Sequence, residues 1–256
     1  MAENQRYPFA LSRRRLVASL AGVAAGATLD SAPAAALTTP LTEWPISRLR
    51  PMSARLARIA AKIGAGNFNL SDFDAVRRTA RTPGIGALSA HEEAEFEALF
   101  ALDAARIGFL GPRVTHSLSA SLPWARLRAV AGSGQHVFPA AWAVFSRARQ
   151  AIGPQLIVTS GARGVPKQML VFINSALRGG LIARTVHSVA PPGYSYHAVG
   201  DIDVGDRHLG GVNFTAAFAG SAIHQRLAAL DFIHFRYPRN NKFGVQFEPW
   251  HLQIAP

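Results

Sequence analysis

Residues 195–205 read SYHAVGDIDVG, and Asp206 follows directly. This stretch places His197 close to three carboxylates in a region that is otherwise strongly basic. From residue 105 to the C-terminus the chain has five carboxylates against fifteen Lys and Arg side chains, and three of the five lie here. Such a concentration of negative charge beside a histidine indicates a cation site, because imidazoles and carboxylates are common ligands of divalent metals.

The spacing within this stretch suits a shared metal ion. His197 and Asp203 are six residues apart, and a turn at Gly200 into a strand would bring both side chains to one ion. Near the C-terminus the sequence EPWH offers His251 as a third ligand, with Glu248 three residues before it. Two imidazoles, a carboxylate and a water make a catalytic zinc site. Glu248, the only glutamate after residue 97, is then the candidate general base.

Each of these features also has a structural interpretation. The pattern His-x-x-Gly-Asp-x-Asp fits a loop whose aspartates bond their own backbone. Glu248 could pair with one of its basic neighbours, and Trp250 could be a core residue. The joint occurrence of the features favours the metal site.

The same stretches resemble a known family. SYHAVGDIDVG, followed about 45 residues later by FEPWH, resembles the M15 metallopeptidases, the zinc D-Ala-D-Ala carboxypeptidases and dipeptidases. The family motifs are Ser-x-His-x-x-Gly-x-Ala-x-Asp and Glu-x-Trp-His, preceded by Ser-Gly-Tyr-Arg. Here TSGARG supplies Ser160, Gly161 and Arg163. The resemblance covers roughly residues 155–254.

The resemblance implies a zinc (Zn2+) site with three ligands: His197, Asp203 and His251. It also implies that Glu248 is the catalytic base. The histidine–aspartate spacing is one residue shorter than in the family motif, and Asp201 stands where the family has alanine. Matching DIDVGD to the family's Ala-x-Asp-Ile-Gly-Asp favours Asp203 as the ligand and leaves Asp201 as the alternative. Asp201 or Asp206 is then expected to orient a ligand imidazole.

The resemblance also implies a substrate site. Arg163 would hold the substrate during catalysis, and Ser195 would contact the substrate backbone. Gln168 falls where the family often has a glutamine after the arginine turn. Ala162 replaces the usual tyrosine, which would widen the pocket beside Arg163. A planar guanidinium suits the C-terminal carboxylate of a peptide, because it can bind one through two parallel hydrogen bonds.

Helical and strand patterns alternate along the chain without a regular βαβ rhythm, which predicts an α+β fold. Helices are expected at 52–64, from Ser89 to the alanines flanking Asp103, at 139–151, 166–179 and 216–230. Strands are expected at 155–160, 201–204 and 231–237, with a strand pair or a kinked strand at 244–254. The resemblance implies the DD-peptidase/Hedgehog type, with a small antiparallel sheet cradling the zinc and a helical N-terminal portion packed against it.

The pattern divides the chain into three parts: an export signal (1–36), a helical N-terminal portion (37–150) that opens with an extended lead-in (37–51), and the catalytic domain (151–256). The signal has three consecutive arginines from Arg13, then an apolar stretch and a small-residue end near Ala36. Its start resembles the twin-arginine motif. An uncleaved anchor is the alternative, but the apolar stretch is short and rich in Gly and Ala. The sequence therefore predicts a periplasmic or secreted protein without a permanent membrane anchor.

Composition narrows the function further. The chain has no cysteine, which excludes disulfides, thiolate zinc sites and a cysteine nucleophile. The net charge of +12 makes nucleic acid a candidate partner. The basic residues are scattered along the sequence, however, so we expect no nucleic-acid binding.

The expected partners are peptidoglycan stem peptides. A non-catalytic metal- or wall-binding module on the same fold and a peptidoglycan endopeptidase remain alternatives, and the sequence leaves open the exact bond cut, the oligomeric state and the role of residues 37–150.

Overall fold

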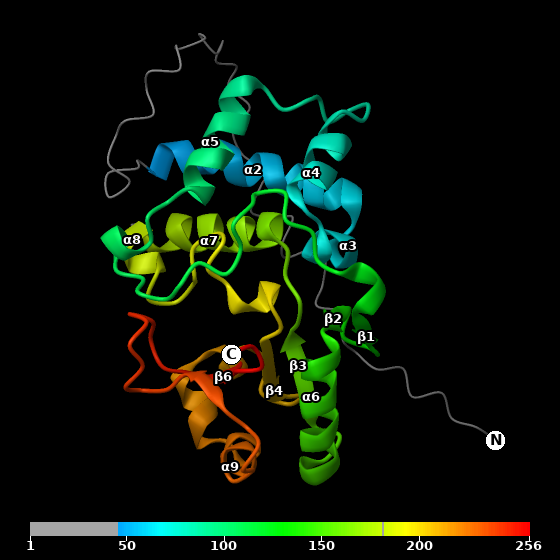
Figure 1. Ribbon diagram of the computed structural model, residues 1–256, viewed down its shortest axis with the longest axis vertical. Helices are drawn as coiled ribbons and strands as arrows, with labels where there is room; N and C mark the ends of the chain where they lie inside the picture. The colour runs from blue at the N-terminus through cyan, green and yellow to red at the C-terminus, as the bar shows by residue number, and fades with distance from the viewer. Residues whose placement is uncertain (1–45, 181) are drawn as a thin grey trace, which may run out of the picture. The chain divides into compact units, whose positions relative to one another are not determined.

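The computed structural model describes residues 46–180 and 182–256 (Figure 1). The predicted export signal and most of the predicted lead-in lie outside these residues. The α-helices are α2 (Ile46–Ile63), α3 (Ala65–Leu70), α4 (Phe73–Ala80), α5 (Ala90–Phe100), α6 (Pro139–Ile152), α7 (Val165–Gly179), α8 (Ile182–Thr185) and α9 (Ala222–Ala228). The strands are β1 (Arg128–Val130), β2 (Gln135–Val137), β3 (Leu156–Ser160), β4 (Ile202–Asp206), β5 (Phe235–Tyr237) and β6 (Glu248–Leu252). The predicted α+β class is confirmed.

Short 3-10 helices connect several of these elements: η3 (Ala105–Ile107), η4 (Trp124–Arg126), η5 (Tyr196–Ala198), η6 (Gly210–Phe214) and η7 (Ala216–Gly220). Two of them, η5 and η6, flank β4. None of the helices in the described ranges is long and apolar enough to cross a membrane.

The first helix is longer than its sequence pattern indicates. α2 begins at Ile46 instead of residue 52, so the predicted extended lead-in is wrong for residues 46–51. Pro51 lies inside this helix, where it removes one backbone hydrogen bond. Leu49 and Met52, on either side of it, are buried in the core. Their burial offsets the cost of the proline.

Helix α5 begins at the predicted capping box. The Ser89 hydroxyl accepts a hydrogen bond from the backbone N–H of Glu92 (3.1 Å), and the Glu92 carboxylate accepts one from the backbone N–H of Ser89 (2.8 Å). These bonds satisfy two N–H groups that have no partner inside the helix. The helix ends at Phe100, before the alanines flanking Asp103, so its predicted end is too late.

Helix α7 follows the β3 strand and packs against α2. Pro166 lies in its first turn, where the missing N–H costs nothing. Gly180 ends it in the left-handed conformation, with φ of +76°. The face with Met169, Phe172 and Ile173 is fully buried. In Figure 1, α7 lies between the N-terminal helices and the elements that carry the sheet.

The main sheet is antiparallel with the strand order β3-β4-β6-β5. Its register places Asp203 of β4 opposite Ser160 of β3 on one side and opposite His251 of β6 on the other. The predicted strand at 231–237 is shorter than expected, and the stretch at 244–254 contains the single strand β6. β1 and β2 form a separate hairpin that the sequence did not predict.

The predicted helix at 216–230 is broken in two. Residues 216–220 form η7, and α9 starts after Ser221. The Ser221 hydroxyl accepts a hydrogen bond from the backbone N–H of His224 (3.1 Å), which caps a new helix. The prediction of one continuous helix is therefore wrong.

Two apolar cores support these elements. The first is built by α2, α4 and α5 together with α7, and the second lies between the main sheet, α6 and α9. Phe172 is a fully buried member of the first core, and Phe145 belongs to the second. The boundary predicted between residues 150 and 151 stays a prediction.

We expect Phe172→Ala to lower the free energy of unfolding by about 3–5 kcal/mol, because it removes a fully buried aromatic side chain and leaves a cavity. Leu110→Ala is the control, since Leu110 is 63% exposed and its loss should change stability by less than about 0.5 kcal/mol. Urea unfolding followed by circular dichroism measures both. Equal effects of the two substitutions would contradict the packing described here.

Candidate metal centre and active site

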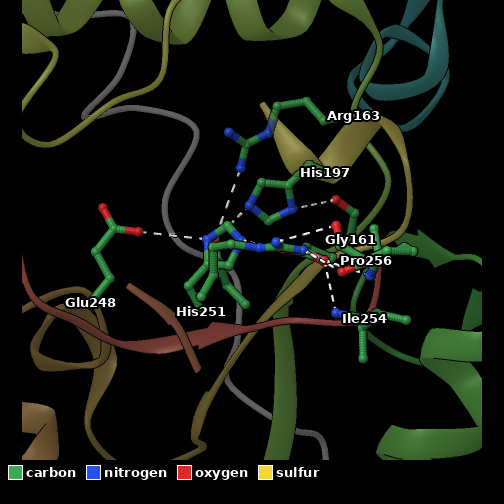
Figure 2. Close-up of polar contacts among 11 residues, drawn as sticks. Gly161, Arg163, His197, Glu248, His251, Ile254 and Pro256 are labelled. Atoms are coloured by element: carbon green, nitrogen blue, oxygen red, sulfur yellow. Dashed lines mark hydrogen bonds and ion pairs between the residues drawn. The ribbon is translucent and has the colours of Figure 1, made fainter. Parts of the chain in front are cut away.

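Three predicted site residues, His197, Asp203 and His251, converge in the structure, and Figure 2 shows the two imidazoles next to each other. Asp203 on β4 and His251 on β6 are directly paired across the sheet, and side chains of such a pair lie on the same face. His197 comes from η5, and Gly200, with φ of +137°, turns the chain from η5 into β4. One ligand atom from each of the three side chains lies within 4.8 Å of the others, and all three residues are buried.

The two imidazoles present different nitrogens to this centre. His197 Nε2 lies 3.3 Å from Asp203 Oδ2, and His251 Nδ1 lies 3.3 Å from Asp203 Oδ1. The other nitrogens are hydrogen-bonded, His197 Nδ1 to the carbonyl of Gly161 (3.0 Å) and His251 Nε2 to Asp201 Oδ2 (3.1 Å). Such bonds fix the tautomer and the ring orientation of metal-binding histidines. Both free nitrogens therefore face Asp203.

Asp201 is on the far side of His251 and is fully buried. Its carboxylate accepts two hydrogen bonds from Arg236 (2.8 and 3.1 Å) and one each from the backbone N–H groups of Ile254 (2.8 Å) and Ala255 (2.9 Å). Burial alone would raise the pKa of Asp201, but the hydrogen bonds from His251 and Arg236 outweigh it and hold the pKa well below its usual range. This geometry suits an orienting role.

The two aspartates left open by the sequence thus differ in position. Asp203 faces the centre, whereas Asp201 reaches His251 from behind. Asp206, the other residue considered for orienting an imidazole, bonds the backbone N–H of His208 (2.9 Å) and its own backbone bonds the side chain of Asn213. The assignment of Asp203 as a metal ligand remains a prediction, which this arrangement supports.

The chemistry of the centre fits a dication. Asp203 Oδ1 is buried and accepts no hydrogen bond from any residue in the described part of the chain. Burial alone would lower the pKa of His251, but its hydrogen bonds with Asp201 and Glu248 raise it to about 10. The carboxylates around His251 therefore stabilise positive charge at this point. A buried carboxylate oxygen without a donor beside two oriented imidazoles matches the donor set of zinc.

Glu248 lies at the edge of the centre. It belongs to β6, is 6% exposed, and has its Oε2 3.5 Å from His251 Nδ1. Burial raises the pKa of the Glu248 carboxyl above its ordinary value. A carboxylate with a raised pKa is a stronger base than an exposed one, which suits it to accept a proton near neutral pH.

Arg163 extends toward the centre from the turn after β3. One nitrogen of its guanidinium donates to the Ser160 hydroxyl (2.6 Å) and lies 4.0 Å from Asp203 Oδ2, and another donates to the side-chain carbonyl of Gln168 (2.8 Å). Burial lowers the pKa of Arg163, and the charge of Asp203 acts against this shift. The guanidinium is thus held in one orientation beside the centre.

Gln168 is a partner of Arg163 within the protein. Its side-chain N–H donates to the backbone carbonyl of Ala190 (2.6 Å), while its carbonyl accepts from Arg163. Both ends of the amide are therefore engaged. Its predicted contact with substrate stays a prediction, and the geometry shows directly that it positions Arg163.

A cavity of about 570 Å³ opens onto the centre. All of the predicted site residues line it: Arg163, Gln168, Ser195, His197, Asp203, Glu248 and His251. Its size is typical of ligand sites. The predicted roles of these residues remain predictions, but the fold brings every one of them to one cavity.

Two residues of the site escaped the sequence analysis. Arg236, the partner of Asp201, lies within a stretch expected to be a strand, and a charged residue inside an apolar strand pattern was the available signal. Tyr237 lines the cavity and packs against the ring of His251, with ring centroids 4.9 Å apart. No signal in the sequence distinguishes it from a core tyrosine.

Comparisons with solved structures find two D,D-peptidases of vancomycin resistance and an LD-carboxypeptidase. The D,D-dipeptidase VanXYg, in complex with a D-Ala-D-Ala phosphinate analogue, is 25% identical with a TM-score of 0.42 over 46% of this chain and 50% of that chain. A variant of the D,D-pentapeptidase VanY from the VanB-type resistance cassette, in complex with Zn(II), is 19% identical with a TM-score of 0.41 over 59% and 88%. The LD-carboxypeptidase LdcB is 22% identical with a TM-score of 0.40 over 57% and 67%.

No curated protein sequence matches the chain. The chain covers half the length of VanXYg, the first of the solved structures. Residues 135–256 match the family model described as VanY: D-alanyl-D-alanine carboxypeptidase, and this segment contains every predicted site residue. The resemblance seen in the sequence motifs is thereby confirmed, because the part of the chain that carries those motifs matches the model of the VanY D-alanyl-D-alanine carboxypeptidase family.

Proposed function

We propose that the protein is a zinc-dependent carboxypeptidase that removes the terminal D-alanine from peptidoglycan stem peptides ending in D-Ala-D-Ala. The observation that carries this proposal is the convergence of two oriented imidazoles and a buried carboxylate within 4.8 Å of one another, with Glu248 beside them in one cavity. The family model that matches residues 135–256 supports the same activity.

His197, Asp203 and His251 would hold the zinc ion. Bound there, zinc supplies a Lewis acid that polarises the scissile carbonyl and makes water acidic enough to attack near neutral pH. Glu248 takes the proton from the attacking water and passes it to the leaving amine. Its buried position and raised pKa favour both transfers.

Arg163 would bind the free carboxylate at the end of the peptide. Its guanidinium is largely buried, and its ion-pair partner among the described residues is Asp203, at 4.0 Å. A substrate carboxylate would therefore compensate a charge that burial destabilises. Ser195 lines the same cavity and would contact the substrate backbone. The predicted export signal at residues 1–36 would deliver the enzyme to the cell wall, where such peptides occur.

A non-catalytic binding module on this fold is the second candidate. It would need the metal ligands but no base, and the position of Glu248 at the centre favours the enzyme. An endopeptidase is the third candidate, and it would differ in not requiring a free carboxylate at the end of its substrate.

Glu248→Gln should abolish most of the activity while zinc content and melting temperature stay at the wild-type level. The amide keeps the shape of the side chain but cannot accept the proton, so kcat should fall by about 10²–10⁴-fold. Release of D-alanine from a pentapeptide ending in D-Ala-D-Ala measures turnover. Unchanged turnover would show that another group takes the proton, and absence of turnover in wild type would favour the binding module.

Arg163→Ala should lower kcat/KM by about 10²-fold or more, because hydrogen bonds between charged groups are lost. Amidating the C-terminus of the peptide should cost the wild type a comparable factor and cost the variant little more. Arg184→Ala is the matched control, since Arg184 is exposed and does not line the cavity. If Arg163→Ala still distinguished acid from amide as wild type does, Arg163 would not have this role. Efficient cleavage of the amide by wild type would indicate an endopeptidase.

A further inference from the structure

One face of α7 lines the cavity beyond the metal centre. Lys167, Val171, Ser175 and Arg178 contribute to its wall, and their spacing places them on one side of the helix, opposite the face buried in the core. Over the eleven residue-to-residue steps from Lys167 to Arg178 the helix rises about 16 Å. An extended peptide of four to five residues has roughly this length. The cavity thus continues along the helix as a groove.

The charge of this groove is unbalanced. Lys167 is half-buried and Arg178 is exposed, and neither side chain has a carboxylate partner or a hydrogen bond within the described ranges. The carboxylates among the described residues that line the cavity are Asp203 and Glu248, and both belong to the metal centre. The α7 wall therefore carries positive charge that no carboxylate among the described residues neutralises.

The environment of Lys167 points to an anionic ligand. Burial lowers the pKa of its ammonium group, and the nearby charge of Arg163 lowers it further. A buried cation without a counter-ion is costly for the folded protein, and an anion bound beside it removes that cost. A carboxylate on a substrate would supply such an anion.

Another part of the cavity wall, formed by residues 188–190, Val245 and Gln246, is held by hydrogen bonds. The backbone N–H of Gln246 donates to the carbonyl of His187 (2.7 Å), and His187 Nδ1 bonds the carbonyl of Gly244 (2.9 Å). Gly244 has φ of +75°, and a Cβ there would lie 2.1 Å from the carbonyl oxygen of Gly108. Only glycine fits this position. The groove is therefore largely formed before a ligand binds, which lowers the entropic cost of binding.

We propose that this groove is a subsite for an acidic peptide, in which Lys167 and Arg178 bind carboxylates that lie upstream of the scissile bond. The direction of the peptide rests on the proposed function, since its C-terminal end must reach the metal centre. The subsite would make the enzyme selective for stem peptides with free carboxylates over neutral peptides with the same D-Ala-D-Ala end.

The test compares two five-residue peptides that end in D-Ala-D-Ala and keep a free C-terminal carboxylate. One carries two acidic side chains within its first three residues, and in the other these two carboxylates are amidated. Titration calorimetry with the Glu248→Gln protein measures the dissociation constants without turnover. We expect the acidic peptide to bind about tenfold or more tightly than its amidated form, with the difference shrinking at high salt.

Added to Glu248→Gln, Lys167→Gln should reduce this preference by about tenfold. Arg178→Gln should reduce it by about threefold, because Arg178 is more exposed and its charge is better screened. Arg184→Gln is the matched control and should keep the full preference, since Arg184 lies outside the cavity. Circular dichroism shows whether each variant is folded. Because Arg178 is exposed, Arg178→Gln should fold normally and can test the subsite even if Lys167→Gln does not fold.

Equal binding of the two peptides, or an unchanged preference in both variants, would overturn the subsite. A separate assay of the wild-type protein distinguishes this from failure of the proposed function. If wild type cleaves the acidic and amidated peptides with equal kcat/KM, the subsite is wrong and the carboxypeptidase stands. If the acidic peptide binds preferentially but no D-alanine is released, the subsite stands and the carboxypeptidase is wrong.

Discussion

The buried carboxylate of Asp201 is the interaction on which the site depends. It has no exposed surface and joins Arg236 of β5, His251 of β6 and the backbone that follows β6. Removing one partner of such a buried network leaves an uncompensated charge, which typically costs about 3–5 kcal/mol. The same carboxylate bonds His251 Nε2 and so holds the ring with Nδ1 facing Asp203. Stability of the sheet and orientation of the proposed metal ligand therefore rest on one side chain.

The distribution of charge follows from that arrangement. From residue 105 onward the chain is strongly basic, and three of its five carboxylates in this region lie around two imidazoles, where Asp203 Oδ1 lacks a donor within the described residues. Beyond this centre the wall formed by α7 is positive. A dication at the proposed metal centre and the cations Lys167 and Arg178 on the wall, which have no carboxylate partner among the described residues, would both favour a ligand with several carboxylates. The proposed metal centre and the proposed subsite thus both present positive charge to the ligand, which would select an acidic peptide with a free C-terminal carboxylate.

Local motifs were enough to predict much of the site, because His197 and Asp203 are close in sequence and Gly200 permits the turn between them. The capping box at Ser89 could likewise be predicted, because it depends only on residues three positions apart. The choice between Asp201 and Asp203 depends on the pairing of β4 with β6, and no local pattern contains that register. Arg236 was missed for the same reason. The helix predicted at 216–230 is interrupted because Ser221 caps a new helix, and α2 begins inside the predicted lead-in because its first turns bury Leu49 and Met52 around Pro51.

The central claim is that one zinc ion lies between His197, Asp203 and His251, and anomalous X-ray diffraction from crystals of the purified protein tests it most directly. Data collected above and below the zinc absorption edge should give one peak per chain at this position. We expect His197 Nε2, His251 Nδ1 and an Asp203 oxygen to lie about 2.0–2.2 Å from the peak. A peak coordinated by Asp201 instead of Asp203 would contradict the ligand assignment. Absence of any peak there, in crystals grown with zinc, would contradict the metal centre itself.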